Sequence, residues 1–333
     1  MPRSWGFWTR YKLEILKNYL DAFTTTTKNH AQKRVYLDLF AGELDNFDRD
    51  TGDPIEGSAR VALNTENPAF SHFQFFELPP KTVALEAALK AEFPDRNWKV
   101  YADCNQSISQ ALIDLHIADA HWAPTFAFID PNGPHYTWGT LIALAAHKGP
   151  KAKTKVELWM LFPDPLFARL LPKTGDLRPK DNRAITDMYG DSAWHAIWQA
   201  KLSDQVDAAS ARTEYVNLMR WRLERELGYK WTHQLEIYNT GGVPIYHMVF
   251  ATDSDAGHRI MTNLYNTAAR EFPDMVSHVR AERQRAKREA QGVYALFEME
   301  GTPVSGTSPQ ALYVHEAPDE PRSHDATTCA YCG

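Results

Sequence analysis

The sequence has few cysteines, no excess of basic residues and no long apolar run. Only Cys104, Cys329 and Cys332 occur in 333 residues. This excludes a disulfide-stapled scaffold and favours a reducing compartment, the cytoplasm. The formal net charge of −6 excludes a uniformly basic coat for nucleic acid but is compatible with a local basic patch. We expect no membrane span, because the sequence contains no run of about 18 apolar residues. The N-terminal residues, with Trp5 and Trp8 but no apolar core, are unlike a signal peptide.

Apolar runs alternate with helical patterns along the first half of the chain. We expect strands over 34–39, 70–76, 98–101, 126–129 and 156–162, and helices over 5–23, 59–64, 80–92, 105–119 and 137–147. Five such repeats predict an α/β fold with a parallel, doubly wound sheet and helices on both faces. The acidic stretch 43–57 is expected to form a long loop.

The later part of the chain departs from this alternation. Helices are expected over 183–200, 207–227, 256–271 and 278–291. Two apolar stretches, 232–238 and 245–251, flank a turn with Gly241 and Gly242, which predicts an antiparallel hairpin. Parallel strands followed by a terminal antiparallel hairpin are typical of the Rossmann-like sheet of class I methyltransferases, whereas nucleotide-dependent dehydrogenases end in a parallel strand.

These patterns divide the chain into four expected segments. They are an N-terminal helix over 1–30, a Rossmann-like domain over 31–275, a basic helix over 276–300 and a flexible tail over 301–333. The tail ends in a C-x-x-C pair, Cys329 and Cys332, which supplies half of a zinc site, with His324 as a third ligand. No fourth ligand is apparent, two unbound thiols are the alternative, and we assign no metal.

Four acidic residues follow successive strands. They are Asp38, Glu77, Asp103 and Asp130, spaced 39, 26 and 27 residues apart. The carboxyl ends of parallel strands meet at one edge of the sheet, where α/β proteins bind nucleotides. There, a carboxylate after the second strand can accept both ribose hydroxyls, and one after the third strand can accept the adenine amine. Taken singly, each acid is also compatible with a solvated loop.

The turn after the first strand contains small residues. Asp38 is followed by Leu39, Phe40, Ala41 and Gly42. Ala41 and Gly42 lack bulk, so the backbone can approach a ligand closely at this point. A plain junction between a strand and a loop has the same pattern.

Several segments together resemble the class I S-adenosylmethionine methyltransferases, and more closely the three-Cys-motif partner family (TcmP). The resemblance covers about residues 8–270 and rests on the order and spacing of 12–20, 37–42, 57–58, 103–105, 128–133, 189–194 and 244–246. It implies a methyltransferase-like fold and an association with a radical-SAM-like three-Cys-motif protein. It also implies S-adenosylmethionine as cofactor, held by Asp38, Phe40, Ala41, Gly42, Glu77, Asp103 and Cys104.

The chain departs from the methyltransferase pattern after Gly42. Leu44 stands where methyltransferases carry a small residue, so we expect it to crowd the methionine end of the cofactor. The acidic stretch that follows adds negative charge near a ligand that bears a carboxylate. These features, together with Asn132, favour the alternative function, a catalytically silent methyltransferase-like module that positions nucleic acid or another enzyme.

The segment Asp130-Pro131-Asn132-Gly133 is the catalytic candidate. It resembles the Asp-Pro-Pro-aromatic motif of enzymes that methylate exocyclic amines on bases, and more closely the Asp-Pro-Phe-Gly of tRNA guanine-amine dimethyltransferases. In those enzymes a carboxylate and a backbone carbonyl accept the protons of the amine, so that its lone pair points at the methyl sulfonium. A Pro-Gly turn that only closes a strand is the alternative.

Candidates for substrate binding surround this motif. Asn132 replaces the stacking aromatic, so Tyr136 or Trp138 is expected to stack on the base. Phe162 and Asp164 belong to a Phe-Pro-Asp-Pro run that faintly resembles tRNA guanine methyltransferases. Residues 148–183 hold nine Lys or Arg, Arg169 among them, against four acids, which suits phosphate contacts. A second basic run spans 280–288, and a solvated surface is the alternative for both runs.

The sequence therefore favours methyl transfer from S-adenosylmethionine to an exocyclic amine in nucleic acid, RNA or DNA, with Asp130 orienting the nucleophile. A nuclease built from the acidic strand ends is a third class of function, and it predicts an effect of divalent metal instead.

Overall fold

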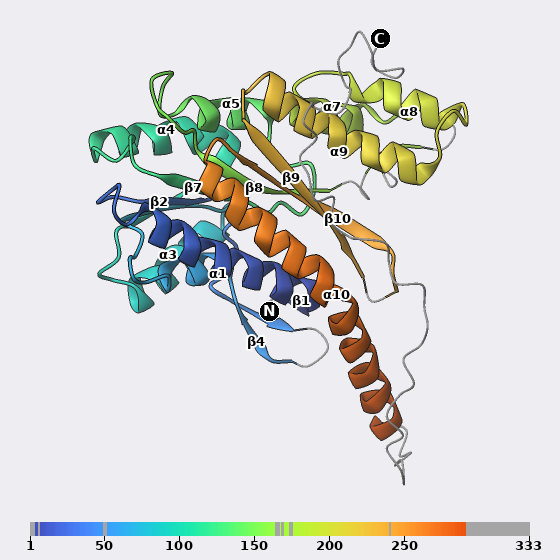
Figure 1. The fold of residues 1–333 in the computed structure, drawn as a ribbon, viewed down its shortest axis with the longest axis horizontal. Helices are drawn as coiled ribbons and strands as arrows, with labels where there is room; N and C mark the ends of the chain where they lie inside the picture. The colour runs from blue at the N-terminus through green and yellow to red at the C-terminus, as the bar shows by residue number, and fades with distance from the viewer. Residues whose placement is uncertain are drawn as a thin grey trace.

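The computed structural model describes residues 4–5, 7–48, 52–163, 167, 170–172, 176–239 and 241–290 (Figure 1). Its centre is a seven-stranded sheet in the order β6-β5-β2-β7-β8-β10-β9. The strands are β2 (Val35–Asp38), β5 (His72–Phe76), β6 (Trp98–Tyr101), β7 (Thr125–Ile129), β8 (Glu157–Phe162), β9 (Trp231–Tyr238) and β10 (Pro244–Thr252).

The strand directions confirm the predicted fold class. The strands β6, β5, β2, β7 and β8 are parallel to one another. The last strand, β10, inserts between β8 and β9 and is antiparallel to both, with Met248 opposite Leu161 and Leu235. This is a Rossmann-like α/β sheet of the methyltransferase type.

Helices cover both faces of the sheet (Figure 1). One face carries α1 (Phe7–Thr27), α2 (Ser58–Leu63), α3 (Lys81–Glu92) and α10 (Asp255–Ala290). The other face carries α4 (Cys104–Ile117), α5 (Trp138–Ala146), α7 (Pro179–Tyr189), α8 (Trp194–Leu202) and α9 (Ala208–Arg225). Because strand side chains alternate, Tyr36 packs with the first layer and Val35 and Leu37 with the second. A strand covered on both faces is predominantly apolar, as β7 and β8 are.

A buried carboxyl group joins α1, β8 and β10 at the amino edge of the sheet. Glu157 accepts a 2.6 Å hydrogen bond from the Tyr19 hydroxyl and a 2.7 Å bond from the Thr252 hydroxyl. Burial raises the pKa of Glu157. At Gly257 in α10, a Cβ atom would lie 2.9 Å from the Tyr19 hydroxyl, so glycine lets the helix close over this group.

The acidic stretch 43–57 is not the irregular loop that we expected. Its described residues form β3 (Asp45–Asp48) and β4 (Pro54–Glu56), and β3 also pairs with β1 (Ser4–Trp5). Strands of two to four residues are too short to show an alternating pattern in the sequence. The small sheet places the N-terminal segment beside the turn that follows β2.

The expected helix boundaries in the later part of the chain are also corrected. The helix expected over 183–200 is two helices, α7 and α8, because Gly190 adopts φ +83° and ends α7. The helices expected over 256–271 and 278–291 are one helix, α10, which continues through Pro273. The segment boundary expected at 275 therefore lies inside a helix that extends away from the sheet (Figure 1).

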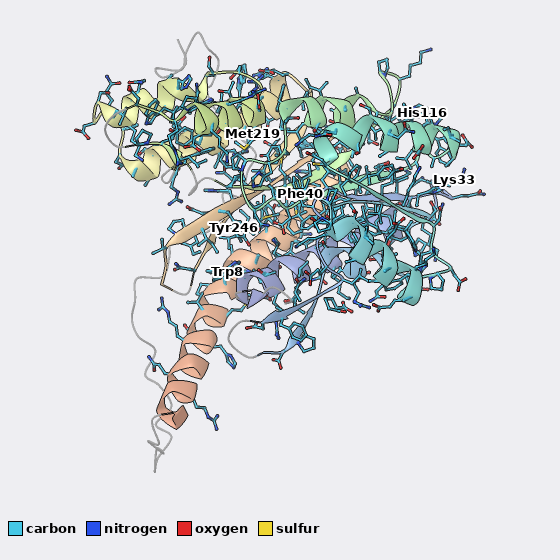
Figure 2. All side chains as sticks on the ribbon, turned by 180° about the vertical axis from the view of Figure 1, so that it is seen from behind. Trp8, Lys33, Phe40, His116, Met219 and Tyr246 are labelled. Carbon is cyan, nitrogen blue, oxygen red and sulfur yellow. The ribbon has the colours of Figure 1, made fainter. Side chains whose placement is uncertain are left out.

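Residues 291–333, with Cys329, Cys332 and His324, lie outside the described residues. Within the described ranges, no helix is both long enough and apolar enough to cross a bilayer. Seen from the opposite side, Phe40 lies near the centre of the molecule, between the helical layers (Figure 2).

Candidate functional site

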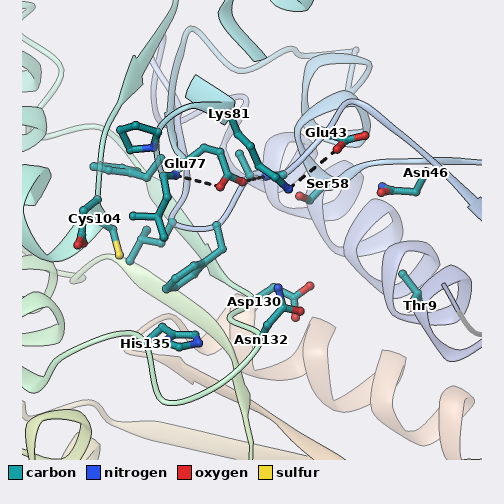
Figure 3. Close-up of a pocket in the computed structure, with 18 of the residues that line it drawn as sticks. Thr9, Glu43, Asn46, Ser58, Glu77, Lys81, Cys104, Asp130, Asn132 and His135 are labelled. Atoms are coloured by element: carbon teal, nitrogen blue, oxygen red, sulfur yellow. Dashed lines mark hydrogen bonds and ion pairs between the residues drawn. The ribbon is translucent and has the colours of Figure 1, made fainter. Parts of the chain in front are cut away.

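A cavity of about 540 Å³ lies at the carboxyl edge of the sheet (Figure 3). Its wall comes from α1, the turn after β2, the segment between β5 and α3, the start of α4 and the turn after β7. The volume lies within the range of about 300–1,000 Å³ that is usual for small-molecule sites. The topology explains the position, because all five parallel strands end at this edge.

The turn after β2 contributes Phe40, Ala41 and Gly42 to the wall. Gly42 has φ +66°, a conformation that favours glycine. Its N–H group donates a 2.9 Å hydrogen bond to Glu77, and the N–H of Ala41 donates to the carbonyl of Phe76 at 3.0 Å. The turn is therefore tied to the end of β5.

Glu77 lies at the lip of the cavity. One carboxylate oxygen accepts from Gly42, and the other accepts a 2.9 Å bond from the N–H of Leu78. Each carboxylate oxygen can accept two hydrogen bonds, so acceptor capacity remains for a ligand. Leu78 is 57% exposed although it is apolar, and the sequence reasoning missed it. Its signal was an apolar residue directly after the strand-end acid.

Asp103 and Cys104 line the cavity at the start of α4. Asp103 caps the helix by accepting a 2.8 Å hydrogen bond from the N–H of Asn105. Burial, followed by the charge of Asp103, raises the pKa of the Cys104 thiol to about 12. The thiol is therefore neutral and inert as a nucleophile at physiological pH.

Asn105 holds the loop after β7 against α4. Its side-chain amide donates to the carbonyl of His135 at 2.7 Å and accepts from Thr137 N–H at 2.9 Å and Thr140 hydroxyl at 2.8 Å. The His135 side chain reaches the cavity wall as a result. Sequence reasoning quoted Asn105 only within a motif, because its partners lie about 30 residues away.

Asp130 and Asn132 line the side of the cavity that lies across from Glu77 and Cys104 (Figure 3). Pro131, between them, is buried and is not part of the described wall. Asp130 forms an ion pair with Lys12 of α1, and the two side chains are 22% and 5% exposed. Sequence reasoning missed Lys12 as a site residue, and its signal was a lysine on the buried face of the first helix.

Asp38 is placed behind the wall rather than in it, which corrects the expected contact with the cofactor. It is fully buried and accepts hydrogen bonds from the N–H of Phe40 at 3.3 Å and the Tyr36 hydroxyl at 3.2 Å. The Ser58 hydroxyl also bonds to it. Burial is the largest cause that raises the pKa of Asp38 to about 7. Asp38 therefore stabilises the turn after β2 through these hydrogen bonds and does not face the cavity.

We expect Asp38 to make stability depend on pH. Because the pKa is about 7 in the folded state and 3.8 for the free group, folding favours the protonated form. Its contribution is fully present below pH about 4 and is lost as the pH rises towards 7. Relative to Asp38→Asn, the unfolding free energy of the wild type should fall by up to about 1.4 kcal/mol per pH unit. Urea unfolding at several pH values between 4 and 8 measures this difference, and a constant difference would contradict it.

Leu44 does not crowd the cavity, so that expectation is wrong. Its side chain is 4% exposed and belongs to the apolar cluster that contains Ile55 and Ala59. The N–H of Gly57 donates a 2.7 Å hydrogen bond to the carbonyl of Leu44. At Gly57, a Cβ atom would lie 3.0 Å from that carbonyl oxygen and closer still to that of Glu43. This close backbone contact turns Leu44 into the core.

The aromatic residues expected to bind substrate are also placed differently. Tyr136, Trp138 and Phe162 are at most 6% exposed and pack in the core between the sheet and the α4–α9 layer. The guanidinium of Arg222 lies 4.5 Å from the Trp138 ring centroid. None of the three is part of the cavity wall. Asp164 and Arg169 lie outside the described residues.

Several Lys and Arg side chains of the basic segment 148–183 form ion pairs in the part of the chain that the structure describes. Lys155 pairs with Asp253, Arg178 with Asp181 and Arg183 with Asp187. These pairs favour the solvated surface over a phosphate-binding patch. Among the described residues no three His, Cys, Asp or Glu side chains converge on a position for a metal ion. The strand-end acids in the cavity wall, Glu77, Asp103 and Asp130, follow three different strands.

No protein-family model matches the chain, and no curated protein matches it. Solved structures similar to it include a Legionella pneumophila protein of family DUF519, 13% identical, with a TM-score of 0.39 over 72% of this chain and 84% of that chain. Another is a DUF574 family protein from Streptomyces avermitilis, 10% identical, with a TM-score of 0.31 over 72% and 82%. The strand order above, not these similarities, assigns the fold.

Proposed function

We propose that this protein is an S-adenosylmethionine-dependent methyltransferase that acts on an exocyclic amine, with nucleic acid as the class of acceptor. One observation carries the proposal. A cavity at the carboxyl edge of a methyltransferase-type sheet has the glycine turn, Glu77, Asp103 and Asp130 in its wall, with Asp130 across from Glu77 (Figure 3). The nucleic-acid class rests on the resemblance of the segment 130–133 to base-methylating enzymes.

The residues of the wall fit this cofactor. Glu77 retains acceptor capacity at the lip, which suits ribose hydroxyls. The exposed side chain of Leu78 can cover one face of an adenine ring. Asp103 adds negative charge to the wall, which suits a ligand with a sulfonium, whereas Glu43 lies 4.0 Å from Lys81. The bound cofactor would supply an electrophilic methyl group.

Asp130 is suited to orient the acceptor. Its Oδ2 atom is engaged by Lys12, and Oδ1 accepts no hydrogen bond from the residues that the structure describes. An amine N–H group can donate to this free acceptor position, which would aim the nitrogen lone pair along a fixed direction. The task needs an acceptor in reach rather than a strong base.

Binding of S-adenosylmethionine and S-adenosylhomocysteine tests the proposal directly. A ligand at 100 times its dissociation constant should raise the unfolding free energy by about 2.7 kcal/mol. Thermal unfolding and isothermal titration calorimetry with both compounds measure this effect, with NAD as the control nucleotide. If neither compound stabilises the protein, it is not a methyltransferase that uses this cofactor.

Replacement of Glu77 by alanine should weaken S-adenosylhomocysteine binding about tenfold or more. The reason is the loss of charge-assisted hydrogen bonds to the ribose, each worth roughly 1.5–3 kcal/mol. Glu77→Gln, which keeps one acceptor oxygen, should lie between alanine and wild type. Glu92→Ala is the control, because Glu92 pairs with Arg60 outside the cavity wall. Equal affinities for all four proteins would contradict this role of Glu77.

The second candidate is a catalytically silent partner of a radical-SAM-like three-Cys-motif protein. The observation that favours it is the position of Tyr136 and Trp138, which leaves Phe40 and Phe76 as the aromatic rings of the described wall apart from His135. The likeness of the segments named above to the three-Cys-motif partner family supports the same candidate. It predicts no stabilisation by either S-adenosyl compound.

A further inference from the structure

Lys12 and Asp130 form an ion pair in the cavity wall. The two residues are 118 positions apart in the chain. The Lys12 side chain is only 5% exposed, and its Nζ atom lies 6.0 Å from the ring centroid of Phe128 and 5.7 Å from that of Tyr246. A buried ammonium group is costly unless it is paired, and aromatic faces add to its stabilisation. Asp130 and the two rings thus hold the Lys12 ammonium group on the Asp130 side of the cavity.

A cation at this position changes which amines can bind beside Asp130. An unpaired carboxylate attracts ammonium ions. Alkylamines are protonated at neutral pH, as lysine is, and a protonated amine has no lone pair to form a new N–C bond. A carboxylate paired with Lys12 keeps lone pairs that accept hydrogen bonds, but the pair has no net charge. It can accept from a neutral amine without attracting an ammonium ion.

The other charges around the cavity do not cancel this effect. Asp38 lies behind the wall, and its charge interacts with that of Asp130, but it is unchanged in every variant compared below. Glu43 lies 4.0 Å from Lys81. Glu77 and Cys104, the residue that follows Asp103, lie across the cavity from Asp130 (Figure 3). Because these groups stay the same when Lys12 is replaced, the change in charge beside Asp130 in a Lys12 variant comes from Lys12.

We propose that Lys12 is a specificity-determining residue, which neutralises Asp130 so that the site takes amines that are uncharged at neutral pH and rejects protonated alkylamines. The acceptor class is then aryl and heteroaryl amines, such as the exocyclic amines of nucleobases, rather than lysine side chains or polyamines. This inference rests on the proposed function, because it assigns a reacting amine to the Asp130 end of the cavity.

Two isomeric probes isolate the charge of the amine. 4-Methylaniline is neutral at pH 7.5, whereas benzylamine has the same atoms and is protonated. Ligand-observed NMR titrations with each probe, on protein saturated with S-adenosylhomocysteine, give the ratio of the two affinities. The wild type is expected to prefer 4-methylaniline. In Lys12→Met the ratio should shift towards benzylamine at least tenfold, because Asp130 is then unpaired.

Further variants separate charge from structure. Lys12→Arg keeps the cation and should keep the wild-type ratio. The double variant Lys12→Met/Asp130→Asn has no charge at either position and should lose the shift towards benzylamine. Lys99→Met is the matched control, since Lys99 pairs with Asp114 outside the cavity wall, and should leave the ratio unchanged. An unchanged ratio in Lys12→Met, or an equal shift in Lys12→Arg, would overturn the inference.

If Lys12→Met does not fold, Asp130→Asn serves instead, because it leaves the Lys12 cation unpaired and should weaken benzylamine binding further; equal or tighter benzylamine binding would overturn the inference. If the wild type does not bind S-adenosylhomocysteine, the proposed function fails. The same titrations on the protein without S-adenosylhomocysteine then test whether Lys12 selects neutral amines, and the same shifts in the affinity ratio are expected.

Discussion

Asparagine in place of Asp130 is expected to lower methyl transfer on the order of 100-fold. The amide retains one acceptor oxygen for a hydrogen bond from Lys12, although it no longer carries the opposite charge. What it loses is the second carboxylate oxygen, Oδ1, which accepts no hydrogen bond from the described residues. Without that acceptor, the amine of the acceptor molecule is no longer held with its lone pair towards the methyl group.

Transfer of tritium from labelled S-adenosylmethionine to total RNA and to genomic DNA measures this loss. The affinity for S-adenosylhomocysteine, measured in parallel, should be nearly unchanged, because the cofactor residues lie across the cavity (Figure 3). Asp114→Asn is the matched control, since Asp114 also pairs with a lysine, Lys99, but outside the cavity wall. Equal activity in Asp130→Asn and the wild type would exclude an orienting role for Asp130.

Alanine in place of Gly190 is expected to destabilise the fold by about 3 kcal/mol. Gly190 has φ +83°, and a side chain in this region costs roughly 1–2 kcal/mol. A Cβ atom there would also lie less than 3.0 Å from three atoms of Trp138. Trp138 is 6% exposed and packed beneath Arg222, so it cannot withdraw without disturbing the core. Such overpacking costs about 1–3 kcal/mol more.

Gly149 offers a control with the same backbone conformation and no contact. Its φ is +74°, and nothing lies within 4 Å of a Cβ atom built there. Gly149→Ala should therefore cost only the backbone strain, about 1–2 kcal/mol. Urea unfolding of both variants measures the difference. Equal losses would mean that the contact with Trp138 contributes nothing to the stability of the α7–α8 connection.

The N-terminal helix has a chemical as well as a structural part in the proposed function. Tyr19 of α1 binds the buried Glu157 at the amino edge of the sheet, and Lys12, two turns earlier, pairs with Asp130 at the carboxyl edge. One helix thus spans the face of the sheet and brings the Lys12 ammonium group to Asp130. Changes in how α1 packs should therefore affect amine selection as well as stability.

The sequence by itself determined the sheet and the edge at which a ligand would bind. Runs such as 35–37 and 126–129 are apolar because both faces of each strand are covered. The turn with Gly241 and Gly242 marked the reversed last strand. The acids after the strands pointed to the carboxyl edge, since all parallel strands end there. The strands, the turn and the strand ends depend on residues that are neighbours in the chain, so local sequence patterns predict them.

Only the tertiary structure decided which of those residues face the cavity. It placed Asp38 behind the wall, turned Leu44 into the core and buried the rings of Tyr136 and Trp138. It also brought Lys12 to Asp130 across 118 residues. The direction of a side chain at a strand end and the partner of a buried charge are set by packing between distant elements. No local pattern in the sequence records that packing.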